Sequence, residues 1–293
     1  MIEKLAFAKI NLFLDVEGVR DDAYHNIISI MQSIDWADEV RIEITPIGEG
    51  IRLTCSDSDI PTDERNTAHK AARLFLERIG NGAGVSIHIT KNIPHAAGLA
   101  GGSADAAAVL LGLNELFQFP LSTEELLVIG KKIGADVPFC IMGGTVLVTG
   151  IGEKLEKLAA FPPCYIVCAK MGEGVPTPQA YAELDRKFDK FRAYQPKGQN
   201  LSCTKTAMER GELSTLRSAV FNIFESVVEP ERPSVTSLKR ALLSCGATVA
   251  MMSGSGPSVF GIFEDLSAAE AANRQLLALG AISRVCRPTQ GNI

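Results

Sequence analysis

The sequence lacks the features that mark secreted, membrane-spanning and nucleic-acid-binding proteins. No apolar run approaches the roughly 20 residues that a transmembrane helix needs. Glu3 and Lys4 interrupt the start of the chain, where a signal peptide would have its apolar core. Acidic residues outnumber basic ones by 34 to 29, and this net charge of −5 suits neither nucleic acid nor an anionic membrane surface. We therefore expect a cytoplasmic protein whose partners are small molecules.

The seven cysteines show no spacing typical of a disulfide framework or a metal site. Cys164 and Cys168 fall within an apolar, strand-like run, which favours packing over metal ligation. The others are scattered, at Cys55, Cys140, Cys203, Cys245 and Cys286. We expect reduced cysteines and no structural zinc.

The two standard nucleotide-binding motifs are also absent. The chain has no phosphate-binding loop that ends in Gly-Lys-Ser or Gly-Lys-Thr. It has no Gly-x-Gly-x-x-Gly followed by an acidic residue about 20 positions later. If the protein binds a nucleotide, it must do so through another motif.

A glycine-rich stretch between Lys91 and Asn114 is the strongest candidate. Alternating apolar residues predict a strand over 84–90, after which come Pro94 and three glycines. Ser103 is a suitable N-cap for a helix through the alanine-rich run that follows. The unpaired amides of a helix N-terminus, reached through a glycine loop, favour a phosphate group. A Gly/Ala-rich turn that leads into a core helix explains the same residues equally well.

Three polar residues elsewhere are candidates for chemistry. Residues 5–16 alternate like a strand, which places Lys9 and Asn11 on one face, about 7 Å apart. Asp136 lies in a short connection before a proline. The alternative for Lys9 and Asn11 is a solvated strand face, and for Asp136 it is a role in a turn or a helix cap.

Local signals predict a mixture of helices and strands. Asn66 and Gly80 bracket an amphipathic helix, and Ser122 with Glu125 forms a capping box for a helix that runs to Gly134. Further strands are expected over 38–45, 145–149 and 165–169, and helices over 180–191, over 206–229 with a break near Gly211, and over 234–245. Residues 247–287 read as strand, glycine turn, strand, helix and strand, a pattern typical of a small antiparallel α+β domain. Pro162-Pro163 marks a joint, so we predict domains of residues 1–160 and 161–293.

Three segments resemble, in order, the motifs of the GHMP kinases, the superfamily of galactokinase, homoserine kinase, mevalonate kinase and phosphomevalonate kinase. They are Ala8–Leu14, Pro94–Ala108 and Met252–Phe260. The resemblance implies a two-domain α+β fold, with an N-terminal domain like domain 2 of ribosomal protein S5 and a ferredoxin-like C-terminal domain. Within the superfamily, the chain is most similar to the branch that acts on a cytidine-diphosphate-linked methylerythritol, through Arg20–His25, Gly134–Phe139 and Pro176–Pro178.

This resemblance implies ATP-dependent phosphorylation of the 2-hydroxyl of that substrate, a step of non-mevalonate isoprenoid synthesis. Phosphoryl transfer depends mainly on positioning and charge neutralisation. Asp136 would accept the hydroxyl proton, and Lys9 would orient Asp136 and stabilise the transferred group. Mg²⁺ would bridge the β and γ phosphates, with no metal ligand assigned in the sequence.

The resemblance also implies two sets of binding residues. ATP would contact Pro94, Ala96, Ala97, Gly98, Leu99, Ala100, Gly101, Gly102, Ser103 and Ala104. The substrate would contact Asn11, Tyr24, His25, Thr177 and Tyr181. Among these, His25 would read the edge of the cytosine, while the rings of Tyr24 and Tyr181 would lie against its faces.

Three alanines depart from the pattern of the family. It usually has glycine where this chain has Ala23 and Ala100, and serine where it has Ala104. If position 100 requires a positive φ, alanine is strained there, and Ala104 offers no hydroxyl to a phosphate or to Mg²⁺. None of these positions is the proposed base or lysine, so we expect an active enzyme.

Two alternatives to this function stay open at this point. A sister kinase that acts on homoserine or mevalonate would share the three motifs and lack the cytosine contacts. A nucleotide-binding protein without catalysis is the other, because a fold does not determine a function; a base beside a lysine argues against it. The expected assembly is a monomer or a weak homodimer.

Overall fold

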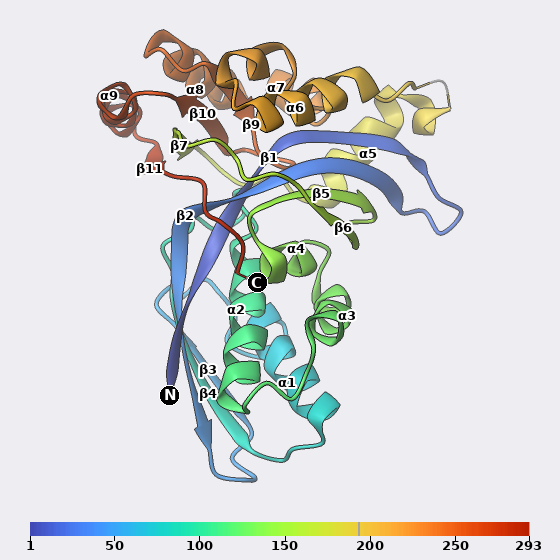
Figure 1. Ribbon diagram of the computed structural model, residues 1–293, viewed down its shortest axis with the longest axis vertical. Helices are drawn as coiled ribbons and strands as arrows, with labels where there is room; N and C mark the ends of the chain where they lie inside the picture. The colour runs from blue at the N-terminus through green and yellow to red at the C-terminus, as the bar shows by residue number, and fades with distance from the viewer. Residues whose placement is uncertain (193, 293) are drawn as a thin grey trace.

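The computed structural model describes residues 1–192 and 194–292 (Figure 1). Up to residue 157 its elements are β1 (Ile2–Val19), β2 (His25–Thr45), β3 (Ile51–Cys55), α1 (Thr67–Ile79), β4 (Gly84–Thr90), α2 (Gly101–Leu116), α3 (Thr123–Ile133), α4 (Val137–Met142), β5 (Thr145–Gly150) and β6 (Lys154–Lys157). The later elements are β7 (Tyr165–Lys170), α5 (Thr177–Lys187), α6 (Gly198–Arg210), β8 (Phe221–Asn222), α7 (Glu225–Glu231), α8 (Pro233–Ser244), β9 (Val249–Met252), β10 (Val259–Phe263), α9 (Leu266–Ala278) and β11 (Ile282–Cys286). Short 3-10 helices cover Asp189–Phe191 and Leu213–Ser218.

The two longest strands, β1 and β2, form an antiparallel pair at the centre of a seven-stranded sheet. The order is β3-β4-β2-β1-β8, and β5 pairs with both β2 and β6. One end of β2, Glu39–Thr45, pairs with β4, whereas Ile27–Gln32 pair with β5. Helices α1 and α2 share an apolar core with β2 and β4. Figure 1 shows the β1–β2 pair running through both halves of the molecule, so β1 brings its residues to the boundary between them.

Strands β7, β9, β10 and β11 form a second sheet, antiparallel throughout, in the order β11-β7-β10-β9. Because successive side chains of a strand point to opposite faces, this sheet contributes to two cores. Phe260 packs in the same core as Ile10 of β1, whereas Val259 and Phe263 pack with apolar residues of α8 and α9. An antiparallel sheet with helices on one face confirms the α+β arrangement predicted for this part of the chain.

Elements with strong local signals lie where the sequence predicted them. The Asn66 side chain accepts a hydrogen bond from the Ala68 amide at the start of α1, and Gly80 ends that helix with a φ of 63°. Ser122 and Glu125 form both hydrogen bonds of the predicted capping box. These signals succeed because each acts within about one helical turn.

The break predicted near Gly211 within residues 206–229 is confirmed, because α6 ends at Arg210. The helix predicted beyond that break is wrong in part, because the structure has a strand inside this range. The two residues of β8 pair in parallel with β1. The Asn222 side chain donates hydrogen bonds of 2.8 Å to the carbonyls of Met252 and Gly254. These tertiary contacts outweigh the local helical pattern. The helix predicted over 180–191 is likewise divided, into α5 and a 3-10 turn.

The solvated face considered for the first strand is also wrong. Every residue from Ala8 to Val16 is buried, because β1 has β2 and β8 as neighbours and packs against both α2 and the second sheet. Lys9 and Asn11 are therefore buried polar residues, which need hydrogen-bond partners.

The division into domains at residues 160 and 161 stays a prediction. Strand β8 comes from the later part of the chain, yet it belongs to the first sheet. Across residues 1–192 and 194–292, no helix combines the length and the apolar character needed to cross a membrane.

Candidate active site

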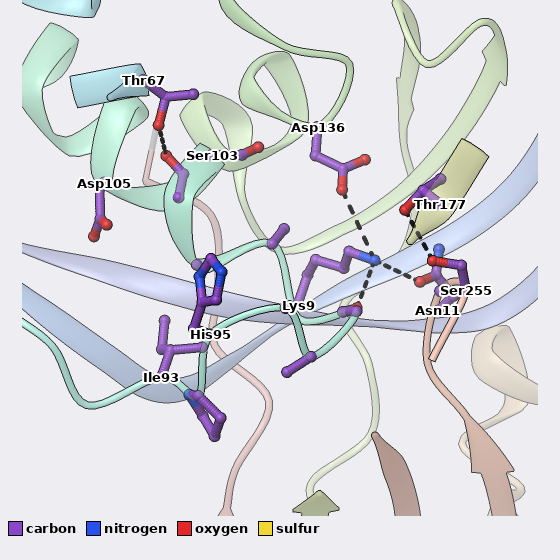
Figure 2. Close-up of a pocket in the computed structure, with 18 of the residues that line it drawn as sticks. Lys9, Asn11, Thr67, Ile93, His95, Ser103, Asp105, Asp136, Thr177 and Ser255 are labelled. Carbon is purple, nitrogen blue, oxygen red and sulfur yellow. Dashed lines mark hydrogen bonds and ion pairs between the residues drawn. The ribbon is translucent and has the colours of Figure 1, made fainter. Parts of the chain in front are cut away.

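Lys9 is a buried lysine between the two sheets, 3% exposed. Its Nζ donates hydrogen bonds to Asn11 Oδ1, at 2.7 Å, and to the carbonyl of Gly98, at 3.0 Å. Its ion pair with Asp136 Oδ2 is long, at 3.9 Å. Figure 2 shows the ammonium group at the meeting point of these three residues. The contact with Asn11 confirms that the two side chains share a strand face.

Asp136 reaches Lys9 from the N-terminus of α4. It occupies the N-cap position, but its side chain makes no capping hydrogen bond. Pro138 lies at the start of the helix, where an amide hydrogen is not needed. The carboxylate, 32% exposed, is directed to Lys9 instead of to its own helix. The alternative of a capping side chain is therefore wrong.

Asn11 is held by a chain of hydrogen bonds. Its Nδ2 donates to Ser29 Oγ, at 2.9 Å, and Ser29 Oγ donates to the carbonyl of Phe13, at 2.6 Å. With its amide nitrogen engaged in this way, Asn11 presents its oxygen to Lys9. The strand thus supplies a lysine and an amide in fixed orientations.

The glycine-rich loop turns beneath Lys9 through a series of left-handed residues. Ala96, Gly98 and Ala100 have φ values of 47°, 74° and 59°, so the positive φ considered at position 100 is present and alanine is strained there. Helix α2 begins directly afterwards, with Ala100 as N-cap and no side-chain capping bond. Its first-turn amides thus have no intrahelical partner.

The prediction that Ser103 caps this helix is wrong. It is the third residue of α2, because the left-handed Ala100 starts the helix earlier than the serine signal suggests. Ser103 lines the cavity described below. A Cβ on Gly134 would lie 3.9 Å from its hydroxyl oxygen, so the hydroxyl lies near the segment that leads to Asp136.

The loop between β9 and β10 packs against the glycine-rich loop. Ser253 Oγ donates to the carbonyl of Gly98, at 3.0 Å, and the Ser258 amide donates to the carbonyl of Ala97, at 3.3 Å. A Cβ on Gly98 would lie 2.3 Å from the carbonyl oxygen of Ser253, so the approach requires glycine. The two loops therefore depend on each other for their shape.

A cavity of about 500 Å³ connects these groups. From the predicted sets it brings together Lys9, Asn11, Pro94, Ala96, Ala97, Gly98, Ala100, Gly101, Gly102, Ser103, Asp136, Thr177 and Tyr181. Leu99 and Ala104 are buried in the core, and neither they nor Tyr24 and His25 are part of the cavity wall. Thr177 Oγ1 lies 3.0 Å from Ser255 Oγ, which also lines the cavity.

His25 and Tyr181 stack on each other. Their ring centres are 4.5 Å apart, with planes inclined by 29°, and His25 Nε2 lies 2.8 Å from Asp185 Oδ1. The rings of Tyr181 and Phe224 meet edge to face, with their centres 5.0 Å apart. Burial, with a smaller contribution from the charge of Asp136, raises the pKa of Tyr181, so its ring acts as a neutral surface in the cavity wall. Tyr24 is 61% exposed and lies apart from this cluster.

A second lysine, Lys91, whose side chain is 7% exposed, was not predicted from the sequence. Its Nζ pairs with Asp38 and, at 2.7 Å, with Asp105 Oδ2. Asp38 Oδ1 also accepts the amides of Asn92 and Ile93, at 2.5 and 2.8 Å. Burial above all raises the pKa of Asp105 to about 7, against the opposing charge of Lys91. Among the groups that the structure describes, Asp105 Oδ1 has no hydrogen-bond partner, although Asp105 lines the cavity.

Part of this second region had a recognisable signal. Asp105 is an acidic residue within an alanine-rich run, which indicates a buried carboxylate that needs a cation. The residues before and at the start of α1 had none, yet Ile60, Arg65 and Thr67 line the cavity. Thr67 Oγ1 donates to the carbonyl of Gly102, at 2.7 Å, which ties α1 to the start of α2 (Figure 2).

The donor set fits a Mg²⁺ ion that is held mainly by phosphates. Within residues 1–192 and 194–292, no three His, Cys, Asp or Glu side chains form a group that could hold a metal ion. Mg²⁺ commonly takes one or two protein oxygens and completes its octahedron with water and phosphate oxygens. The carboxylate of Asp136 and the hydroxyl of Ser103 both line the cavity and offer such oxygens.

Comparisons with known proteins agree with this arrangement. The family model for the GHMP kinases N terminal domain matches residues 66–144, and that for the GHMP kinases C terminal matches residues 204–282. The chain belongs to the GHMP kinase family. A Caldicellulosiruptor bescii protein named 4-diphosphocytidyl-2-C-methyl-D-erythritol kinase is 45% identical over 92% of both chains. An Exiguobacterium sibiricum protein of the same name is 45% identical over 88% of this chain and 87% of its own.

A solved structure is similar over almost the whole chain. It is described as a crystal structure of 4-(cytidine 5'-diphospho)-2C-methyl-D-erythritol kinase. It matches with a TM-score of 0.81 and 30% sequence identity, and the match covers 99% of this chain and 100% of that one. The similarity therefore includes both loops and both sheets around the cavity.

Proposed function

We propose that the protein transfers the γ-phosphoryl group of ATP to the 2-hydroxyl of 4-diphosphocytidyl-2-C-methyl-D-erythritol, a step of non-mevalonate isoprenoid synthesis. The main support for this substrate is the 45% identity, over 92% of both chains, to a kinase that is named for it. The cavity supports this choice, because the ring of Tyr181 in its wall provides a flat surface on which a base can stack.

The phosphates of ATP would lie on the glycine-rich loop and the first turn of α2. Backbone amides can approach the phosphates closely there, and the helix dipole favours negative charge. Lys9 faces the same space and would stabilise charge on the transferred group. When bound, Mg²⁺ neutralises part of the phosphate charge. The hydroxyl of Ser103 would hold the Mg²⁺ ion.

The transfer itself needs a proton acceptor and an aligned hydroxyl. The substrate oxygen attacks the γ phosphorus, its proton passes to Asp136 Oδ2, and the bond to the leaving ADP breaks as the new P–O bond forms. Lys9, 3.9 Å from that carboxylate oxygen, would hold Asp136 in orientation. Lys9 lies on β1 and Asp136 lies at the N-terminus of α4. The fold therefore sets the positions of these two residues before the substrate binds.

The nucleotide end of the substrate would lie beside Tyr181. Asn11 and Thr177 would contact its polar groups, and Tyr24 and Tyr181 would enclose the cytosine, whose edge His25 would read. Tyr24 would have to turn from its exposed position, and His25 from its stack on Tyr181, to do so. The cytoplasm as location, and a monomer or weak homodimer as assembly, remain part of the proposal.

A coupled assay for ADP formation with a panel of acceptors tests the function. With ATP and Mg²⁺, we expect turnover of the CDP-linked methylerythritol and no comparable turnover of its UDP-linked analogue, homoserine or mevalonate. A higher kcat/KM for homoserine or mevalonate would replace the substrate assignment. Binding of ATP without turnover of any acceptor would indicate a nucleotide-binding protein instead.

A further inference from the structure

Residues 287–292, which we name the strap, connect the second sheet to the first. The strap leaves β11 and runs back along β2, and Figure 1 shows it descending to end beside α4. The amide of Arg287 donates to Asp35 Oδ1, at 2.7 Å, and the amide of Asp35 donates to the carbonyl of Arg287, at 3.0 Å. The amide of Thr289 donates to the carbonyl of Ser33, at 2.9 Å. The strap is therefore fixed to β2 before it reaches the helix.

Asn292 then closes the C-terminal end of α4. Its amide donates to the carbonyl of Met142, at 2.9 Å, and its Nδ2 donates to the carbonyl of Cys140, at 2.8 Å. The last carbonyls of a helix have no partner within the helix, so the strap satisfies two of them. A Cβ on Gly143 would lie 3.1 Å from the Asn292 nitrogen, so a side chain there would press against the strap.

The helix that the strap closes is the one that carries Asp136. It has only six residues, and no side-chain bond caps its N-terminus. Helices this short are not stable through their own hydrogen bonds. The amide of Cys140 donates to the carbonyl of Asp136, at 3.0 Å, so the residue that the strap binds is itself bonded to the proposed base.

We propose that Asn292 is a positioning residue for phosphoryl transfer, which acts through α4 to hold Asp136 in front of Lys9. The inference rests on the proposed function of Asp136 as the base. The strap begins in the sheet whose β9–β10 loop supports Gly98. One segment thus relates the position of the base to that of the phosphate loop.

The test compares the kinetics of the wild type with those of Asn292→Ala, Asn292→Gln and Gln290→Ala. Gln290 is an exposed residue of the same strap and serves as the matched control. We expect Asn292→Ala to lower kcat about tenfold, with the KM for ATP and for the acceptor within about twofold, because a small misplacement affects the reacting atoms and not the binding contacts. Asn292→Gln keeps the amide donor and should recover much of the kcat, and Gln290→Ala should match the wild type.

Hydrogen exchange of the α4 amides provides a readout that needs no substrate. We expect residues 140–143 to exchange about tenfold faster in Asn292→Ala than in Gln290→Ala, since local opening of the helix becomes easier. If Asn292→Ala does not fold, Asn292→Asp keeps the size of the side chain and replaces the donor with a carboxylate, which cannot donate to the carbonyl of Cys140, so the same two measurements apply to it.

A folded variant without the donor that keeps the wild-type kcat, or that changes only KM, would overturn the positioning role. Unchanged hydrogen exchange of the α4 amides would show that Asn292 does not stabilise this helix. Failure of the wild type to use the CDP-linked acceptor would count against the proposed function alone, because the exchange comparison does not depend on it.

Discussion

Two lysines with buried side chains line the same cavity, and their surroundings differ. Lys91 contacts two carboxylates, those of Asp38 and Asp105. Lys9 contacts an amide oxygen and a backbone carbonyl. Among the residues that the structure describes, its one ion pair, with Asp136, is 3.9 Å long. The positive charge of Lys91 is already neutralised at close range, whereas that of Lys9 is largely not.

This difference separates a structural ion group from a reactive one. A buried charge needs partners, and an ion pair without a ligand is mainly a means to hold elements together. Lys91 joins β2, β4 and α2 in this way. Lys9 has capacity left for an anion, and perturbed or incompletely compensated charges in a cleft are typical of functional sites. An anionic ligand would complete the surroundings of Lys9 and would add nothing to those of Lys91.

The largest expected effect follows from removing the acceptor beside Lys9. Asp136→Asn keeps the shape of the side chain and cannot take the proton, so kcat should fall by ~10²–10⁴-fold. The KM for ATP and the melting temperature should stay close to those of the wild type. Steady-state kinetics and a thermal melt measure these quantities. A variant with nearly normal kcat would remove Asp136 from the base role.

The next prediction sets the two lysines directly against each other. Lys91→Met leaves two buried carboxylates without their cation, which should lower the free energy of unfolding by about 3–5 kcal/mol. Lys9→Met leaves mainly neutral acceptors unpaired, which should cost about 1–3 kcal/mol, but it should abolish most turnover. Urea unfolding and the coupled assay decide between them. Equal losses of stability in both variants would contradict the distinction.

A smaller effect concerns the pH dependence of the Lys91 group. Burial raises the pKa of Asp105 from its ordinary value of 3.8 to about 7. Between these values the folded protein binds a proton that the unfolded chain releases, so this residue makes stability fall as the pH rises through that window. Asp105→Asn removes this contribution. The stability of the variant relative to the wild type should therefore rise from pH 4 to pH 7 and level off above pH 7. Denaturant unfolding at each pH measures this difference. A difference that does not change with pH would exclude the raised pKa of Asp105.

The smallest effect concerns the loop that joins the two lysines. Gly98 accepts a bond from Lys9, and a Cβ on Gly101 would lie 3.4 Å from Lys91 Nζ. Ala100 between them has a φ of 59°, so Ala100→Gly should raise the free energy of unfolding by about 0.5–1 kcal/mol as the strain is removed. Ala104→Gly, inside α2, is the matched control and should lower it by a similar amount. Thermal melts of both variants suffice, and a loss in Ala100→Gly would show that the loop is not strained.

Some parts of this structure were predictable because their signals are local. The cap at Asn66, the capping box at Ser122 and the strand over 84–90 each depend on residues within a few positions of one another. The sharing of one strand face by Lys9 and Asn11 followed from the alternation of a strand. The motifs then placed Asp136 and the glycine loop at one site, which the cavity joins.

Other parts were not predictable because they depend on partners far away in the chain. Lys91 pairs with Asp38 across 53 residues, and no local pattern in either segment indicates this. Residues 221 and 222 have a helical context but pair with β1 instead. Ser103 is a good capping residue, yet the N-cap of α2 is the left-handed Ala100. The loop takes its shape from Ser253 on the other side of the cavity, which a local pattern does not include.

The pairing of β8 with β1 also has a consequence for how the protein is made. β1 is translated long before its partner at Phe13 and Leu14, which is not synthesised until residue 221. Until then one edge of β1 lacks its neighbour, and an open strand edge is prone to pair with other chains. The loop that supports Gly98 is translated later still. ATP binding should therefore appear only after the β9–β10 loop has been translated, and nascent chains that stall before residue 221 should depend on chaperones to stay soluble.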